Sequence, residues 1–169
     1  MFSSLALGGV PTAEDGDGST SLSNMVIEKV AGITEEIFEA VQRLVPQLGA
    51  HKAPPTREEL TALVGSEAST LLIARYPDEK GEIAGMLTLS IYRVPTGIRS
   101  IVEDVIVDET MRRRGIAEAL MLRAIDLARE SGANGVSLTS NPKREAANKL
   151  YQSMGFQKRE TNAYFYKLE

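Results

Sequence analysis

The sequence is organised around one stretch, Val105-Ile106-Val107-Asp108-Glu109-Thr110-Met111-Arg112-Arg113-Arg114-Gly115-Ile116-Ala117. Valine and isoleucine dominate before Asp108, which is typical of a strand buried on both faces. After Gly115, apolar residues recur at helical spacing while most charges lie off that stripe, so the pattern predicts a helix that packs one face on a sheet. Residues 112–117 then straddle the first turn of this helix, where backbone N–H groups lack intrahelical partners and the helix dipole is positive. Such a turn binds anions, phosphates above all.

Two familiar phosphate-binding motifs do not fit this turn. No Lys-Ser or Lys-Thr pair follows Gly115, which excludes the P-loop, and the further glycines of a dinucleotide-binding fingerprint are missing. By itself, a glycine between a strand and a helix more often marks only a tight turn, and three successive arginines more often mark a solvated surface.

A third pattern does fit. The run Arg112-Arg113-Arg114-Gly115-Ile116-Ala117 resembles the Arg/Gln-x-x-Gly-x-Gly/Ala motif of the GNAT superfamily of N-acetyltransferases, which binds the pyrophosphate of acyl-CoA. Later in the chain, Ala146-Ala147-Asn148-Lys149-Leu150-Tyr151-Gln152-Ser153-Met154-Gly155-Phe156 is similar to the family's Ala-x-x-Leu-Tyr-x-x-x-Gly-Phe. Both motifs occur in the family's order with a predicted strand between them, and the resemblance covers roughly residues 25–168.

Periodicity and turn residues predict the remaining elements. Strands are expected at 25–30, 70–76, 82–92, 98–107 and 136–140, with two short strands at 156–158 and 164–168. Helices are expected at 35–45, from the capping box at Thr56 to Gly65, at 116–129, and around Tyr151 up to Gly155. A strand, long helix and strand in succession imply a right-handed parallel crossover. The predicted fold class is α/β, a mixed sheet with antiparallel N-terminal strands and a central parallel pair flanked by helices, as the GNAT resemblance implies.

Composition limits the function classes. The 169 residues contain no cysteine and one histidine, His51, so we expect no disulfide, no cysteine nucleophile and no metal site. The net charge of −4 argues against a nucleic-acid-binding protein, and no apolar run is long enough for a membrane span. Residues 1–24, rich in glycine, serine and acidic residues, are expected to be a flexible tail before a single domain at 25–169. The expected compartment is the cytoplasm.

The resemblance implies which residues would bind acetyl-CoA. Backbone N–H groups from Arg113 to Ala117 would hold the pyrophosphate, with Gly115 permitting close approach and Arg112 or Arg114 adding charge. The exposed backbone of Val105, Ile106 and Val107 would pair with the pantetheine. The cofactor-binding set is therefore Val105, Ile106, Val107, Arg112, Arg113, Arg114, Gly115, Ile116, Ala117 and Asn148. Family members often have a cofactor-contacting asparagine where this chain has Arg144, which would either contact a CoA phosphate or face solvent. Asn141 and Asn148 are nearby substitutes for that asparagine, and Asn148 is the better placed of the two on the helix.

Three residues are candidates for proton transfer. The resemblance places the Tyr151 hydroxyl near the thioester sulfur as the acid for the leaving thiolate, whereas most helical tyrosines are simply amphipathic. Glu103 and Asp104 interrupt an apolar strand and are candidate bases. Because neighbouring strand residues face opposite sides, we expect at most one of them, Glu103 by preference, to face the acceptor. The alternative is a carboxylate paired with Arg93 or Arg99.

These observations favour an acetyl-CoA-dependent N-acetyltransferase in which a primary amine attacks the thioester directly. The acceptor would be a small-molecule or peptide amine, and a homodimer is left open. The alternative is a GNAT-like domain that binds acyl-CoA as a sensor or regulator without catalysis. Binding of nucleic acid through Arg112 to Arg114 is less consistent with the sequence, because no basic excess surrounds those charges.

Overall fold

A computed structural model describes residues 25–49 and 51–168, so the tail predicted at 1–24 lies outside the described residues. Its centre is a five-stranded sheet in the order β1-β2-β3-β4-β5. The first four strands are antiparallel and β4 pairs with β5 in parallel, which confirms the predicted mixed sheet. The strands are β1 (Val26–Lys29), β2 (Ser69–Tyr76), β3 (Glu82–Val94), β4 (Gly97–Val107) and β5 (Val136–Leu138).

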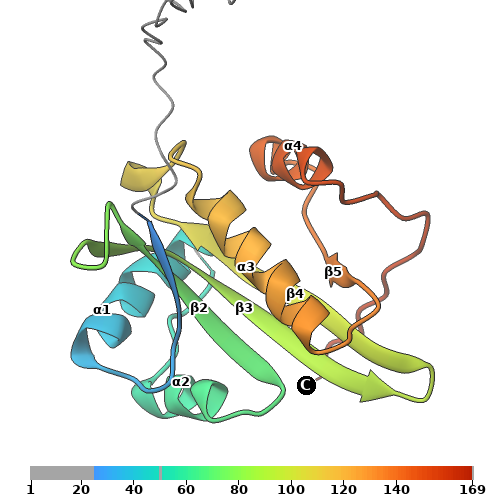
Figure 1. The fold of residues 1–169 in the computed structure, drawn as a ribbon, viewed down its shortest axis with the longest axis horizontal. Helices are drawn as coiled ribbons and strands as arrows, with labels where there is room; N and C mark the ends of the chain where they lie inside the picture. The colour runs from blue at the N-terminus through green and yellow to red at the C-terminus, as the bar shows by residue number, and fades with distance from the viewer. Residues whose placement is uncertain (1–24, 50, 169) are drawn as a thin grey trace, which may run out of the picture.

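Helices cover both faces of the sheet (Figure 1). They are α1 (Glu35–Leu44), α2 (Arg57–Val64), α3 (Ile116–Glu130) and α4 (Glu145–Ser153), with 3₁₀ helices η2 (Val45–Leu48) and η3 (Glu109–Met111). One core cluster joins α1 and α2 to one sheet face, and a second joins α3 to the other. The parallel crossover from β4 through α3 to β5 therefore leaves α4 beside the short strand β5, at the edge of the sheet.

The sequence signals at the helix ends act as expected. The Thr34 side chain accepts a hydrogen bond from the N–H of Ile37 at the start of α1. Thr56 and Glu59 form both bonds of the predicted capping box before α2. Pro46 ends the α-helical hydrogen bonding of α1, and the chain continues as η2, because a proline without an N–H is accepted at the start of a helical turn.

The C-terminal prediction was wrong in detail. No strand is present within 156–168, and β5 ends at Leu138 rather than at residue 140. The strand expected at 164–168 contains three successive aromatic residues, but their side chains are exposed, with Phe165 at 91%. Strand propensity mainly reflects packing against neighbouring strands, and this segment has no such partner among the described residues. Because β5 ends at Leu138, β4 has no strand partner on that side beyond Val102 among the described residues.

A buried carboxylate ties the end of β4 to α1. Asp108 is 4% exposed, forms an ion pair with Arg43, and accepts hydrogen bonds from the Thr110 N–H at 3.0 Å and hydroxyl at 2.8 Å. Burial opposes ionisation of Asp108, but the bonds from Thr110 and the charge of Arg43 outweigh it and lower the pKa of this carboxyl below its ordinary value. Asp108 thereby fixes the turn that leads into the arginine run.

Replacing Asp108 with asparagine should destabilise the domain by about 2 kcal/mol at pH 7, since it leaves the half-exposed Arg43 without its partner. Because the pKa of Asp108 is lower in the folded state than its ordinary value of 3.8, the ionised carboxylate stabilises the fold above pH 3.8. This stabilisation is lost as the pH falls through the pKa of the folded state. Urea unfolding should therefore show a difference between wild type and variant that is full at pH 7 and shrinks below pH 3.8.

The matched control is Asp126→Asn, which breaks the exposed pair between Asp126 and Arg129. Exposed pairs contribute little, so this change should cost less than about 0.5 kcal/mol. Equal losses for the two variants at pH 7 would contradict the role given to Asp108.

Candidate active site

The two sequence motifs face each other across one groove of about 910 Å³. One side consists of the end of β4 and the first turn of α3, and the other consists of α4 with the residues before it. Eight of the predicted cofactor-binding residues line the groove: Val105, Ile106, Val107, Arg112, Arg113, Gly115, Ile116 and Ala117. Tyr151 and Arg144 line it from the opposite side. The fold thus brings together segments that the sequence separates by a helix and a strand.

The turn before α3 offers a row of backbone donors. Arg113 and Gly115 have φ values of 65° and 76°, the left-handed conformation that turns successive N–H groups toward one side. Among residues 25–49 and 51–168, no oxygen accepts a hydrogen bond from the N–H groups of residues 113–117. Unsatisfied donors at the positive end of a 15-residue helix form a site for an anionic group.

The edge of β4 is open along the same groove. Strand β5 pairs with β4 only at Ser100, Ile101 and Val102. Past this point the β5 side of β4 has no strand partner in the described chain, while the other side continues to pair with β3 through Val107. The Val107 carbonyl accepts a hydrogen bond of 3.5 Å from Nε of Arg112. Backbone groups without a strand partner at Val105 to Val107 are what pairing with an amide-containing chain such as pantetheine requires.

Two predicted cofactor-binding residues do not line the groove. The Arg114 guanidinium lies over the ring of Tyr76, 5.1 Å from its centroid, and Nη1 is 3.3 Å from the Tyr76 hydroxyl. The side-chain amide of Asn148 donates to the carbonyl oxygens of Asn141 and Arg144, at 2.9 and 3.0 Å. Both side chains are occupied by contacts within the fold, so their assignment to the cofactor stays a prediction.

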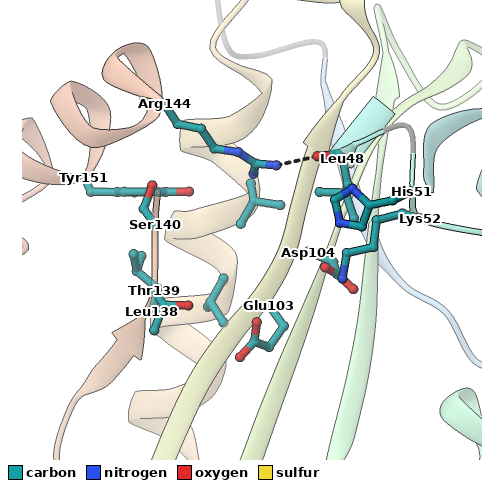
Figure 2. Close-up of a pocket in the computed structure, with 12 residues that line it drawn as sticks. Leu48, His51, Lys52, Glu103, Asp104, Leu138, Thr139, Ser140, Arg144 and Tyr151 are labelled. Atoms are coloured by element: carbon teal, nitrogen blue, oxygen red, sulfur yellow. Dashed lines mark hydrogen bonds between the residues drawn. The ribbon is translucent and has the colours of Figure 1, made fainter. Parts of the chain in front are cut away.

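A second, smaller cavity of about 220 Å³ adjoins the groove. Figure 2 shows that its walls come from the segment after α1, from β4, from the end of β5 and from α4. It is lined by Leu48, His51, Lys52, Val102, Glu103, Asp104, Val105, Leu138, Thr139, Ser140, Arg144 and Tyr151. We call it the acceptor pocket. Leu48, Val105, Arg144 and Tyr151 line both cavities and so surround the passage between them.

Both candidate bases line this pocket, which corrects the expectation that only one would. In the pairing with β3, Thr88 lies opposite Glu103 and Met86 lies opposite Ile106, so Leu87 alone faces two residues of β4. This β-bulge includes Asp104, whose φ is 49°. Alternation is broken there: Val102 packs in the core beneath α3, whereas Ile106 packs in the core beneath α1. Strict alternation would have placed those two on one face.

Neither carboxylate is engaged by a nearby cation. Among the described residues, Glu103 and Asp104 form no ion pair, and the predicted alternative, a bond to Arg93 or Arg99, is not formed. Arg99 instead donates to the Thr96 hydroxyl at 3.1 Å. Both carboxylates are exposed to the pocket and available to an acceptor amine.

Tyr151 lies where the two cavities meet. Its ring packs edge-on against Phe156, with centroids 6.0 Å apart, and its hydroxyl points into the space between α4 and β4 (Figure 2). Burial raises the pKa of the Tyr151 phenol, and the nearby charge of Arg144 partly opposes this rise. The phenol therefore keeps its proton at neutral pH, as a proton donor must.

A family model for the acetyltransferase (GNAT) family matches residues 34–156, more than half of the chain. The chain belongs to the GNAT acetyltransferase family. The GCN5-related N-acetyltransferase 4, chloroplastic, of Arabidopsis thaliana is 29% identical over 72% of this chain. The chain spans about half the length of this curated relative, at 50%. The sequence prediction of the family is confirmed.

Solved structures show the same GNAT fold. An aminoglycoside acetyltransferase from an uncultured soil metagenomic sample, in complex with trehalose, has a TM-score of 0.76 at 20% identity, covering 88% of this chain and 99% of that one. The acetyltransferase AAC(6')-Iy, in complex with the bisubstrate analogue CoA-S-monomethyl-acetylneamine, has a TM-score of 0.68 at 19% identity, with coverage of 86% and 99%. At these identities the likeness establishes the fold.

Two polar residues of the pocket in this GNAT domain were not predicted from the sequence. Thr139 and Ser140 follow the carboxyl end of a parallel strand, a position where polar residues of α/β sheets often meet ligands, and that signal was available. Leu48, His51 and Lys52 reach the pocket only because η2 passes over the end of β4.

No group of three His, Asp or Glu side chains able to hold a metal occurs in the described part of the chain. None of the described helices has the length and apolar character of a membrane span.

Proposed function

We propose that this protein is an N-acetyltransferase that moves the acetyl group of acetyl-CoA to a primary amine by direct attack. The observation that carries the proposal is the passage between the two cavities. On one side, unpaired N–H groups and a free strand edge suit the pyrophosphate and pantetheine of acetyl-CoA. On the other, two unpaired carboxylates suit an ammonium group.

In the proposed reaction, a carboxylate acts as the base and Tyr151 acts as the acid. The acceptor amine enters protonated, and Glu103 or Asp104 takes its proton to free the lone pair. The amine nitrogen then attacks the thioester carbon, forming the C–N bond, and the C–S bond breaks. Tyr151 gives its phenolic proton to the departing sulfur, and the proton lost by the new amide nitrogen restores the Tyr151 phenol. The carboxyl group then releases the ammonium proton to solvent, which returns the site to its starting charge. No covalent enzyme intermediate is needed.

The acceptor that fits best is a small molecule with a primary amine. The acceptor pocket holds about 220 Å³ and its walls carry both signs of charge, from Glu103, Asp104 and Lys52. Two of the structural neighbours are described as aminoglycoside acetyltransferases, which supports an amine-bearing small molecule without selecting one. The cytoplasm is the compartment we propose, and fractionation would test it, since the Arabidopsis relative is described as chloroplastic.

The deciding experiment measures thiol release from acetyl-CoA with amino sugars, polyamines, aminoglycosides, amino acids and a lysine peptide. We expect release with one of these classes. In parallel, acetyl-CoA at about 100 times its Kd should stabilise the protein by about 2.7 kcal/mol, which raises Tm by roughly 5–10 °C. Stabilisation without release would favour the acyl-CoA sensor, and the absence of both would contradict the proposal.

A further inference from the structure

Arg144 connects two parts of the site that are far apart in the sequence. It stands immediately before α4, and its Nη2 donates a hydrogen bond of 2.7 Å to the carbonyl oxygen of Leu48 in η2. Figure 2 shows the guanidinium reaching from α4 across the open side of the site to that carbonyl. The bond thus spans the boundary between the acetyl-CoA groove and the acceptor pocket, both of which Arg144 and Leu48 line.

The segment after α1 has few other hydrogen bonds to the rest of the protein, and its Val45 and Leu48 side chains pack against the core cluster beneath α1. We define it as Val45–Gly49 with His51 and Lys52. Gln47 holds its beginning, because its Oε1 accepts from the N–H of Glu109 at 2.9 Å. Beyond Leu48, the backbone bonds are internal to the segment, from Gly49 to Pro46 and from Lys52 to Gly49. Among the described residues, the bond from Arg144 is the one that joins this segment to α4.

The position of this segment matters more for the acceptor pocket than for the groove. His51 and Lys52 line the acceptor pocket and not the groove, and Leu48 lines both. Gln47 lines the groove alone, but its bond with Glu109 holds it there independently of Arg144. If Leu48 moves away from α4, the wall that carries His51 and Lys52 moves with it. The groove keeps the edge of β4 and the turn at residues 112–117 before α3, which we call the anchor turn. Neither contacts Arg144 through a hydrogen bond.

We propose that Arg144 is a positioning residue that holds the segment after α1 against α4, and so shapes the acceptor pocket. The inference deepens the proposed function and rests on it for its kinetic consequence. A guanidinium suits this task, because it presents several N–H donors on a long side chain and keeps its charge at any physiological pH. The same charge lies beside Tyr151, where it opposes the effect of burial on the phenol.

Amide hydrogen exchange of the free protein tests the contact without any assumption about the reaction. In Arg144→Met, which keeps an apolar stem but no donor, peptides containing Gly49 to Lys52 should exchange roughly tenfold faster than in wild type. Arg144→Lys should restore part of the protection, since an ammonium can also donate to the Leu48 carbonyl. Exchange of this segment in Arg144→Met equal to that of wild type would overturn the proposal.

Lys143→Met is the matched control. Lys143 lines the same groove and precedes α4, so its loss removes an equal charge from the same place, but its side chain makes no hydrogen bond in the part of the chain that the structure describes. Exchange at Gly49 to Lys52 should stay at the wild-type rate in this variant. Faster exchange here as well would show that charge near α4, rather than the Arg144 bond, holds the segment.

Steady-state kinetics tests the consequence for the acceptor. With an amine found by the thiol-release assay, Arg144→Met should raise the acceptor KM about tenfold and leave the acetyl-CoA KM within about twofold, and Arg144→Lys should recover part of the loss. Equal increases in both KM values would contradict a role specific to the acceptor pocket. A protein that acetylates no amine would refute the proposed function, while the exchange data would still decide whether Arg144 holds the segment.

Discussion

The Gly115→Glu variant should lose acetyl-CoA binding, with the affinity falling by about 100-fold or more. Gly115 stands at the N-cap of α3 in the left-handed conformation, at the centre of the N–H groups that face the groove. A glutamate side chain there would occupy the space of the phosphate and bring a like charge beside it. Isothermal titration calorimetry with acetyl-CoA measures the loss directly.

A second glycine supplies the control for backbone strain. Gly132 has the same φ of 76° but lies after the end of α3, and a Cβ added to it would meet only an ordinary contact with Ile98 at 3.8 Å. Gly132→Glu therefore introduces the same charge and a similar strain, of about 1–2 kcal/mol, away from the groove. We expect both variants to lower Tm, but only Gly115→Glu to lose binding. Unchanged affinity in Gly115→Glu would remove the basis for the phosphate site.

The anchor turn could be predicted from sequence because its causes are local. A valine-rich run, a glycine and an amphipathic stripe between residues 105 and 129 specify a strand, a tight turn and a helix without reference to the rest of the chain. The same holds for the caps at Thr34 and Thr56, whose partners lie three residues away. Tyr151 lines the groove because α4, which carries most of its motif, packs beside the parallel pair.

The features that were missed depend on partners distant in sequence. The bulge at Asp104 arises from the register of β4 against Leu87 of β3, and no property of the string Val102 to Val107 encodes it. Strands predicted at 156–158 and 164–168 had suitable residues but no neighbouring strand. Arg144 differs from the asparagine common in the family, and its partner Leu48 lies in another part of the chain, so its contact could be found only in three dimensions.

Tyr151→Phe should reduce kcat by about 100-fold while leaving the affinity for acetyl-CoA within about threefold, because general acid catalysis typically contributes 10²–10⁴ in rate. The phenylalanine ring keeps the edge-on packing against Phe156 and the wall of the passage. What the variant lacks is the hydroxyl group that we propose protonates the departing sulfur. Stopped assays of thiol release measure kcat, and calorimetry measures the Kd for acetyl-CoA independently.

The matched control is Tyr92→Phe, which removes the same hydroxyl from an exposed tyrosine of β3 outside both cavities and should leave kcat unchanged. Equal losses of kcat and acetyl-CoA affinity in Tyr151→Phe would assign Tyr151 a structural role. The pH profile adds an independent criterion. Because burial raises the pKa of Tyr151 above its ordinary value of 10.0, any loss of rate from deprotonation of this group should begin at a higher pH than for a free phenol. This fall in kcat at high pH should disappear in Tyr151→Phe, and its persistence there would assign the proton donor elsewhere.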